Sequence, residues 1–185
     1  MTQCYKIANL IVEMSAFGKT LEQAAPYLCE AAQPDIRIPS DYLLLKEKQP
    51  HLSDDSCAYL CTGNSFYSQL LHFDGMMLHA SAVVADGCAY LFSAPCGTGK
   101  STHAQLWLRE FGDRAYILND DKPALRCEDG IWYAYGTPWS GKTDQNKNKS
   151  VPLQGICFLE RSAENRIEVM PAREAVHRIL DQTIR

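Results

Sequence analysis

The stretch LFSAPCGTGKSTHAQLW, residues 91–107, passes from an apolar run through a glycine-rich turn into a helical pattern. This order is typical of the Walker A phosphate-binding loop, in which a glycine and four further residues precede Gly-Lys-Ser or Gly-Lys-Thr. Ala94 stands where the first glycine is usual, and the residues expected to bind phosphate are Pro95, Cys96, Gly97, Thr98, Gly99, Lys100, Ser101 and Thr102. The stretch therefore predicts an α/β fold with a nucleotide site between a strand and a helix.

The residue types in this loop suit phosphate binding. Gly97 and Gly99 let the backbone turn successive N–H groups toward a phosphate. Lys100 supplies a cation for the outer phosphates, Ser101 offers a hydroxyl to Mg²⁺, and the helix that begins here adds its positive end. The alternative is a glycine-rich turn that carries Gly-Lys-Ser without binding a nucleotide. The apolar run before the loop and the helical pattern after it favour the nucleotide site.

A pair of carboxylates follows the next apolar run, in YILNDDKP at residues 116–123. A strand–helix–strand crossover would return the end of this run to the loop, where a carboxylate is needed to hold Mg²⁺ or to activate a nucleophile. Because successive strand residues point opposite ways, we expect one of Asp120 and Asp121 to face the phosphate and the other to face the metal or the sheet edge. The alternative is a solvated Asp-Asp-Lys turn.

Two histidines lie close to these motifs. His79 is in LHASAVV, residues 78–84, in the middle of an expected strand. His103 follows Lys100 on the first turn of the expected helix. Position alone leaves open whether either histidine is catalytic or structural.

Turn signals indicate how the sheet is connected. Asp86-Gly87 and Asp129-Gly130 each separate two apolar runs, which predicts two β-hairpins. Further strands are expected after the second hairpin, followed by a helix, at residues 151–161, 166–171 and 172–185. Because hairpins make antiparallel pairs, the sheet is predicted to be mixed and hairpin-rich, unlike the all-parallel sheet of a doubly wound fold.

The N-terminal part has a different pattern. Residues 1–75 are expected to form a small α/β flank, not necessarily independent, that packs on a catalytic core of residues 76–185. Within the flank we expect a strand over residues 5–13, a helix over 18–31, and one or two helices over 53–73.

Caps and breakers refine these helices. Thr20 is expected to cap the first helix, and Pro26 to kink it or to delay its start. Ser53 is expected to cap the later helical stretch, and Gly63-Asn64 to interrupt it.

Composition excludes several classes of protein. The 185-residue chain has a net charge of −4, so nucleic acid is not an expected partner. Its apolar runs are too short to span a bilayer and its first residues do not resemble a signal peptide, so a cytoplasmic protein without a membrane partner is expected. The eight cysteines include no Cys-x-x-Cys pair, and Cys57 with Cys61 on one helix face is a weak zinc signal. Reduced, mostly buried thiols are expected, except at Cys96 in the loop.

Three segments in order, LHASAVV, FSAPCGTGKST and ILNDDKP, resemble the catalytic domain of HPr kinase/phosphorylase. The resemblance is closer to the small HPr-kinase-like serine kinases, including those encoded beside ribosomal peptide-modification genes, and covers about residues 70–185. That family has the P-loop core of ATP-dependent phosphoenolpyruvate carboxykinase. The resemblance therefore implies this α/β core, ATP and Mg²⁺ as cofactors, a serine-bearing protein, peptide or small molecule as acceptor, and a homo-oligomer.

The resemblance also implies roles for single residues. Lys100 and the loop would hold the ATP phosphates, and Ser101 and Asp121 would bind Mg²⁺. Asp120 would orient or deprotonate the acceptor hydroxyl, although an exchange of roles between the two aspartates stays open. His79 matches the family's histidine near the transferred phosphate.

One further loop, YGTPWSGKTDQNKN at residues 135–148, falls where that family carries a glycine-rich signature of a different amino-acid sequence. We expect an acceptor or nucleotide loop here, formed by Gly136, Thr137, Trp139, Gly141 and Lys142. The alternative is a hairpin exit with a packed tryptophan.

The sequence also departs from the family. Besides Ala94, it has no clear match to the family's acidic signature residue, which favours a kinase without phosphorylase activity. The last helix ends sooner than in relatives, which indicates a shortened C-terminal region. The leading interpretation is ATP-dependent phosphoryl transfer to a serine hydroxyl. The alternatives are a non-catalytic ATP-binding or precursor-recognition protein and, at a much larger usual chain length, a carboxykinase acting on oxaloacetate.

Overall fold

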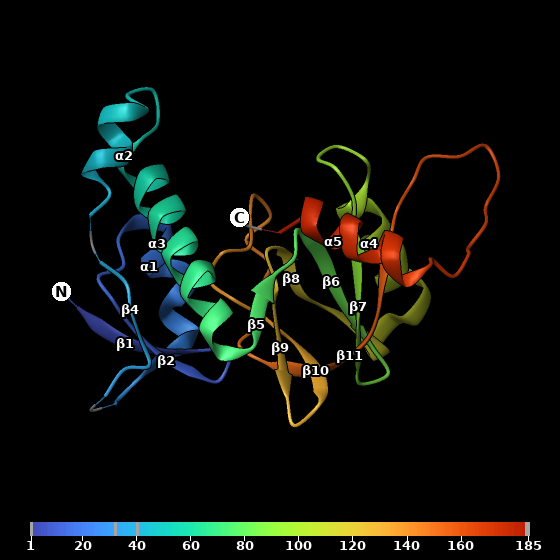
Figure 1. Ribbon diagram of the computed structural model, residues 1–185, viewed down its shortest axis with the longest axis horizontal. Helices are drawn as coiled ribbons and strands as arrows, with labels where there is room; N and C mark the ends of the chain where they lie inside the picture. Colours follow the sequence, from blue (N-terminus) through green and yellow to red (C-terminus); the bar gives the residue numbers. More distant parts are fainter. Residues whose placement is uncertain (1, 32, 40, 184–185) are drawn as a thin grey trace.

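The computed structural model describes residues 2–31, 33–39 and 41–183 (Figure 1). The fold is mixed α/β and contains two mixed sheets. The smaller sheet has the strand order β3-β1-β2-β4, and the larger has the order β5-β9-β10-β11-β7-β6-β8. The predicted mixed, hairpin-rich α/β architecture is thus confirmed.

The smaller sheet is built from the N-terminal residues, with strands β1 (Gln3–Ile7), β2 (Leu10–Met14), β3 (Leu28–Cys29) and β4 (Ile36–Arg37). The single strand expected over residues 5–13 is wrong, because β1 and β2 form an antiparallel hairpin. Ala8 and Asn9 make its turn with φ angles of 52° and 60°. Two consecutive left-handed residues are typical of a tight hairpin turn, and no glycine marks this one in the sequence.

The first helix is shorter than predicted, and α2 lies where no helix was predicted. Helix α1 (Gly18–Ala24) is followed by the 3-10 turn η1 (Ala25–Tyr27), and α2 spans Leu43–Lys48. Thr20 lies inside α1 with its side chain buried, so it is not the cap. Pro26 belongs to η1 and ends the helix, since proline cannot donate the next helical hydrogen bond.

Helix α3 (Asp54–Leu70) is continuous, and η2 (Leu71–Phe73) follows it. Ser53 is its N-cap, as predicted, and its Oγ accepts a hydrogen bond from the Ser56 N–H at 3.1 Å. The expected interruption at Gly63-Asn64 does not occur. Gly63 instead provides space for an indole ring, because a Cβ there would lie 3.0 Å from Cδ1 of Trp139.

The larger sheet contains β5 (Gly75–Met77), β6 (Ala80–Ala85), β7 (Cys88–Ser93), β8 (Ala115–Asp121), β9 (Ala124–Glu128), β10 (Ile131–Tyr135) and β11 (Ser150–Phe158). Both predicted hairpins are confirmed: β6 pairs antiparallel with β7, and β9 with β10. Their turns have positive φ at Asp86, Gly87, Asp129 and Gly130. Strand β11 pairs parallel with β7.

Helix α4 (Lys100–Phe111) and the turn η3 (Gly112–Arg114) connect β7 to β8. Strand β6 lies between β7 and β8 and is antiparallel to both, so β7 and β8 run in the same direction. The residues that follow β7 and those that end β8 therefore lie at the same end of the sheet, at the carboxyl ends of these two strands. Ala104, Phe92 and Ile117 fix α4 on this sheet through a small core cluster.

The C-terminal segment differs from its prediction. The strand expected over residues 166–171 is wrong, since Ile167 and Val169 are 90% and 99% exposed and lie in irregular backbone. Helix α5 (Ala172–Asp181) ends before the predicted limit at residue 185, and residues 184–185 lie outside the described residues.

One core cluster joins the two sheets. Helix α3 stands between them (Figure 1), and Phe66 and Leu70 pack with Tyr5 of β1, Tyr135 of β10 and Trp139. Residues 1–75 and the larger sheet thus share apolar side chains.

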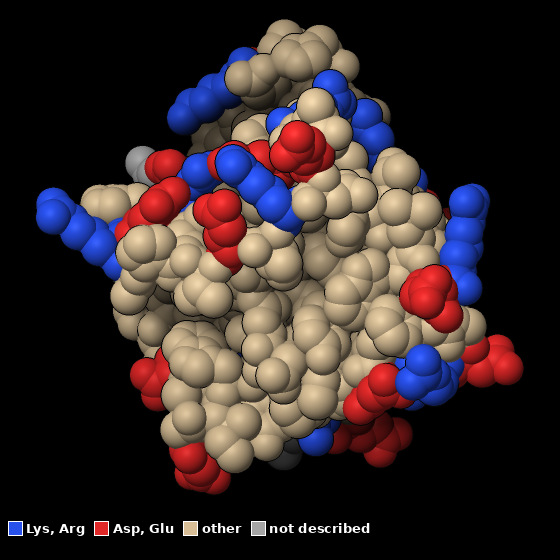
Figure 2. Space-filling model, turned by 90° about the vertical axis from the view of Figure 1, so that its right-hand side faces the viewer, with Lys and Arg blue, Asp and Glu red and all other residues tan. Residues whose placement is uncertain are grey.

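The surface shows charges of both signs. On the face that lies to the right in Figure 1, uncharged side chains cover the centre and charged ones lie mainly around the rim (Figure 2). Within the described residues, none of the helices combines the length and apolarity needed to cross a membrane.

Candidate functional site

Residues 94–99 connect β7 to α4 at the end of the sheet where β8 also ends. Gly97 and Gly99 have φ angles of 78° and 121°, which glycine adopts easily. Ala94 has no positive φ, so alanine fits the first position of the loop without strain. Pro95 and Cys96 are exposed, as are Ser101 and Thr102 on the first turn of α4.

Lys100 turns back into this loop. Its side chain is buried, and Nζ donates a hydrogen bond to the Ala94 carbonyl oxygen at 2.9 Å. Lys100 is the first residue of α4, and its ammonium reaches back to the residue that directly follows β7.

Asp120 stands across from the loop at the end of β8. Ser101 Oγ donates to its Oδ1 at 3.1 Å, and Thr143 Oγ1 donates to its Oδ2 at 2.9 Å. The hydroxyl of Ser81 on β6 also donates to Oδ1. The crossover therefore brings the first aspartate beside the loop, as predicted from the strand–helix–strand order.

Lys100 and Asp120 are charged residues that are buried without a close ion pair. Lys100 is 8% exposed and Asp120 is 6% exposed. Within the described residues, neither forms a salt bridge; their polar partners are a carbonyl and three hydroxyls. Buried charges are costly unless a counter-ion or metal accompanies them. Lys100 is therefore a candidate to bind an anion, and Asp120 a candidate to bind a cation.

Asp121 makes a separate set of contacts. Its Oδ1 lies 3.1 Å from His79 Nε2, and its Oδ2 accepts from Lys122 Nζ. Burial acts to raise the pKa of the Asp121 carboxyl, but the hydrogen bonds and charges of His79 and Lys122 outweigh it and hold the pKa well below its usual value. Its φ of 125° is strained for a non-glycine residue, which is common at functional sites.

His79 lies between β5 and β6, not in the middle of a strand as predicted. Its backbone N–H donates to the Gln182 carbonyl oxygen at 2.8 Å, and its Nδ1 is 3.2 Å from Gln182 Oε1. The residue after α5 thus fixes the imidazole that contacts Asp121.

His103 has a packing role. Its ring lies 4.5 Å from the Phe92 ring centroid in an edge-on arrangement, and burial lowers its pKa. The structure does not bring its side chain into contact with either aspartate.

The segment from Gly136 to Lys142 approaches the site mainly through backbone. A Cβ on Gly136 would collide with the Lys147 carbonyl oxygen, and one on Gly141 would lie 2.7 Å from the Asp121 Cβ. Lys142 is exposed. Gly141 is therefore the member of this segment that packs against a site carboxylate.

Thr137 and Trp139 of the same segment are fully buried. Thr137 Oγ1 bonds to the Tyr67 hydroxyl at 2.8 Å, and the Trp139 ring stacks on Phe66 with centroids 5.0 Å apart. Their side chains anchor the segment to α3.

Sequence reasoning missed four residues of the site. Ser81 could have been noticed as a hydroxyl within the apolar run ASAVVA, and Lys122 as the neighbour of Asp121. For Thr143, the only indication in the sequence was its place in a polar loop. Nothing in the sequence indicated Arg161, although its guanidinium donates a hydrogen bond to the Gly97 carbonyl oxygen at 2.7 Å.

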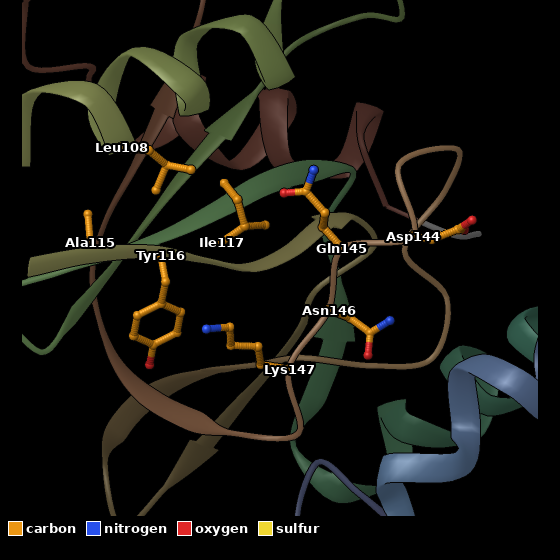
Figure 3. A pocket seen from close by; sticks show the side chains of 8 residues that line it. All are labelled: Leu108, Ala115, Tyr116, Ile117, Asp144, Gln145, Asn146 and Lys147. Atoms are coloured by element: carbon orange, nitrogen blue, oxygen red, sulfur yellow. The ribbon is translucent and has the colours of Figure 1, made fainter. Parts of the chain in front are cut away.

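A cavity of about 310 Å³ lies between α4, β8 and the segment 144–147 (Figure 3). Leu108, Ile117 and Tyr116 supply its apolar walls, and Lys147 a cation. The backbone N–H of Asp120 donates to the Gln145 carbonyl oxygen at 3.0 Å, which connects the cavity wall to the site.

Comparison with known proteins corrects the family expected from the motifs. A family model described as SynChlorMet cassette protein ScmC matches residues 62–183, more than half of the chain. No curated protein matches the chain. The matched family is not an HPr kinase family and no kinase family matches, so the assignment to HPr-kinase-like proteins is wrong. Three short motifs were too few residues to identify a family. The matched range includes the loop, both aspartates and His79.

Proposed function

This chain belongs to the SynChlorMet cassette protein ScmC family, and we propose that it binds ATP with Mg²⁺ and transfers the terminal phosphoryl group to a serine hydroxyl. One observation carries the proposal: buried Lys100 and buried Asp120 flank the same loop and neither has a partner of opposite charge among the described residues. A polyphosphate bound with its metal ion would give both side chains a partner of opposite charge.

Residues 94–102 act in this proposal as a phosphate-binding loop. Lys100 needs only to leave the Ala94 carbonyl oxygen to meet a phosphate oxygen. Gly97 and Gly99, with positive φ, let N–H groups of the loop face the same anion, and the N-terminus of α4 adds its partial positive charge. A phosphate here would also offset the energetic cost of burying the Lys100 ammonium.

The residues beside the loop fit Mg²⁺. Ser101 Oγ and Asp120 Oδ1 are hard oxygen donors 3.1 Å apart. Mg²⁺ bound with nucleotide usually takes one or two protein carboxylates plus phosphate oxygens, so it does not need the groups of three acidic, His or Cys residues that the described residues lack. When bound, the ion would neutralise charge on the outer phosphates.

The geometry favours Asp120 for the metal and Asp121 for the acceptor. These roles are the reverse of those that the resemblance implied for the two aspartates. Ser101 contacts Asp120, whereas Asp121 is paired with His79. Asp121 stays ionised at neutral pH because its pKa is lowered, so it can accept a hydrogen bond from the acceptor hydroxyl and orient it. A carboxylate of low basicity suits phosphoryl transfer, in which positioning contributes more than proton abstraction.

The proposed step is balanced as follows. The acceptor oxygen forms a bond to the γ-phosphorus while the bond from that phosphorus to the bridging oxygen breaks and ADP leaves. The hydroxyl proton is released to solvent as the new bond forms, while Asp121 holds the hydroxyl in position. Lys100 stabilises the charge that develops on the phosphoryl oxygens.

The test is incubation of the purified protein with ATP, Mg²⁺ and serine-containing peptides or free serine, with mass spectrometry for the gain of one phosphoryl group. Lys100→Ala should weaken ATP binding and abolish transfer, and Asp120→Asn should abolish the Mg²⁺-dependent part of ATP binding. Lys48→Ala and Asp129→Asn, at exposed positions on α2 and in a hairpin turn, are the matched controls.

The outcomes separate the alternatives. Binding of ATP that needs Lys100, without transfer to any acceptor or hydrolysis, would favour a non-catalytic ATP-binding protein. ATP affinity that is unchanged in both Lys100→Ala and Asp120→Asn would overturn the nucleotide site itself.

A further inference from the structure

The outer edge of β8 is only partly covered. Strand β8 is the last strand of the larger sheet, with β6 on its inner side. Along its outer side, Lys147 N donates to the Leu118 carbonyl oxygen at 2.9 Å, and Asn146 forms a bridge with Asn119. Within the described residues, no strand pairs with the outer side of β8 at Ala115 to Ile117. An open edge offers unpaired backbone groups to another extended chain.

The three residues of this uncovered part of the edge also line the cavity between α4, β8 and the segment 144–147 (Figure 3). Leu108 and Ile117 lie on the α4 side of β8, whereas Tyr116 and Lys147 lie together on the other side. A chain placed along the edge would therefore have apolar contacts on one face and an aromatic ring with cations on the other.

The cations at this edge lack counter-ions. Nζ of Lys147 and Nζ of Lys149 lie 4.5 Å and 5.1 Å from the centroid of the same Tyr116 ring. Within the described residues, neither lysine forms a salt bridge, and Asp144, the acidic residue of the cavity wall, is already paired with Lys19. Two ammonium groups held at one ring repel each other, so the place favours an anionic ligand.

We propose that the open edge of β8 binds an extended acidic segment of a polypeptide, with its backbone paired to residues 115–117 and its carboxylates on Lys147 and Lys149. The proposal rests on the proposed function in taking this segment as part of the phosphoryl acceptor. The substrate class is thus a peptide or protein with acidic residues near the modified serine, in place of free serine.

The position of the edge sets the spacing in such an acceptor. Tyr116 lies on the same strand as both aspartates, four residues before Asp120 and five before Asp121, the carboxylate proposed to orient the acceptor. An extended chain rises roughly 3.3 Å per residue, so the lysines act about 13 Å from the carboxylates of the site. The acidic residues should lie about four positions from the acceptor serine.

The test uses labelled serine peptides and fluorescence anisotropy with the full chain, first without nucleotide. One peptide carries two Glu about four positions from the serine, in either direction, and its matched control carries Gln at those positions. A third peptide keeps the Glu residues and has prolines at alternate positions of the paired part, because proline removes backbone donors. Protein variants are Lys147→Gln/Lys149→Gln, with Lys48→Gln as the control for a lysine elsewhere.

The proposal expects the Glu peptide to bind about fivefold to thirtyfold more tightly than the Gln peptide, and added salt to reduce the difference. The double lysine variant should lose this difference, Lys48→Gln should keep it, and the proline peptide should bind weakly. Equal binding of Glu and Gln peptides, or an unchanged preference in the double variant, overturns the acidic site. Equal binding of the proline peptide overturns pairing at the edge.

A transfer assay with the same peptides separates this proposal from the proposed function. Phosphorylation of Glu and Gln peptides at equal kcat/KM would overturn the acidic acceptor and leave the transferase intact. Selective binding of the Glu peptide without phosphorylation would overturn the transferase and leave the peptide-binding edge.

Discussion

At the scale of the residue, Gly141 shows how closely the site is packed. Its φ is 70°, and a Cβ would lie 2.7 Å from Cβ and 2.9 Å from Cγ of Asp121. We predict that Gly141→Ala destabilises the protein by about 2–4 kcal/mol, because strain and a collision add. Gly130→Ala is the matched control, since its φ is 80° but nothing lies within 4 Å, and it should cost about 1 kcal/mol. Urea unfolding measures both, and equal losses would contradict the close contact.

Asp121 gives a prediction for pH. Its folded pKa is lowered, so its contribution to stability is present above the unfolded pKa of about 4 and is lost as pH falls through the folded pKa. The difference in unfolding free energy between the wild type and Asp121→Asn should therefore be largest near neutral pH and shrink steadily below about pH 4. Urea titrations at a series of pH values check this. A difference that is independent of pH would show that the ion contacts with His79 and Lys122 contribute nothing.

At the scale of the element, Gly63 reverses the usual helix rule. Alanine in the middle of a helix is favoured over glycine by about 1 kcal/mol. A Cβ at Gly63 would, however, meet three indole atoms of Trp139 at 3.0 to 3.2 Å. We predict that Gly63→Ala is destabilising by about 1–2 kcal/mol, whereas Asn64→Ala on the exposed side of α3 is neutral or slightly stabilising. Thermal melts of the two variants test this prediction. Stabilisation by Gly63→Ala would show that the indole can move aside.

The same element shows what could be read from the sequence. The Ser53 cap, the two Asp-Gly hairpins and the β7–loop–α4 unit follow local rules, so they were predictable. Glycine at position 63 of the uninterrupted α3 makes room for an indole 76 residues further along the chain, which no local rule detects. Likewise Asp120 was expected beside the loop from topology alone, whereas Thr143 and Arg161 reach the site through long-range contacts that only the folded chain defines.

At the scale of the whole molecule, the N-terminal part contributes both core and site. Lys19 of α1 donates to the Gly141 carbonyl oxygen at 2.6 Å and pairs with Asp144. Tyr59 of α3 accepts from the Gly141 N–H at 2.9 Å. The segment that packs on Asp121 is therefore held from the side of the smaller sheet, and the flank expected from the sequence helps to position the site.

This sharing of core predicts how the chain folds when it is divided. The family match begins at residue 62, but the cluster of Phe66, Tyr135 and Trp139 is completed by Tyr5 and other side chains of the smaller sheet. A fragment of residues 53–185 would expose these aromatic rings, each of which contributes about 1.5–3 kcal/mol when buried. We predict that it lacks a cooperative thermal transition and has poorly dispersed amide resonances, whereas the full chain has both. The substitution Leu43→Ser, at a 62% exposed position in the removed part, should leave the melt of the full chain unchanged. A fragment that melts cooperatively near the temperature of the full chain would show instead that the larger sheet folds alone, and that the removed part serves only to hold Gly141 through Lys19.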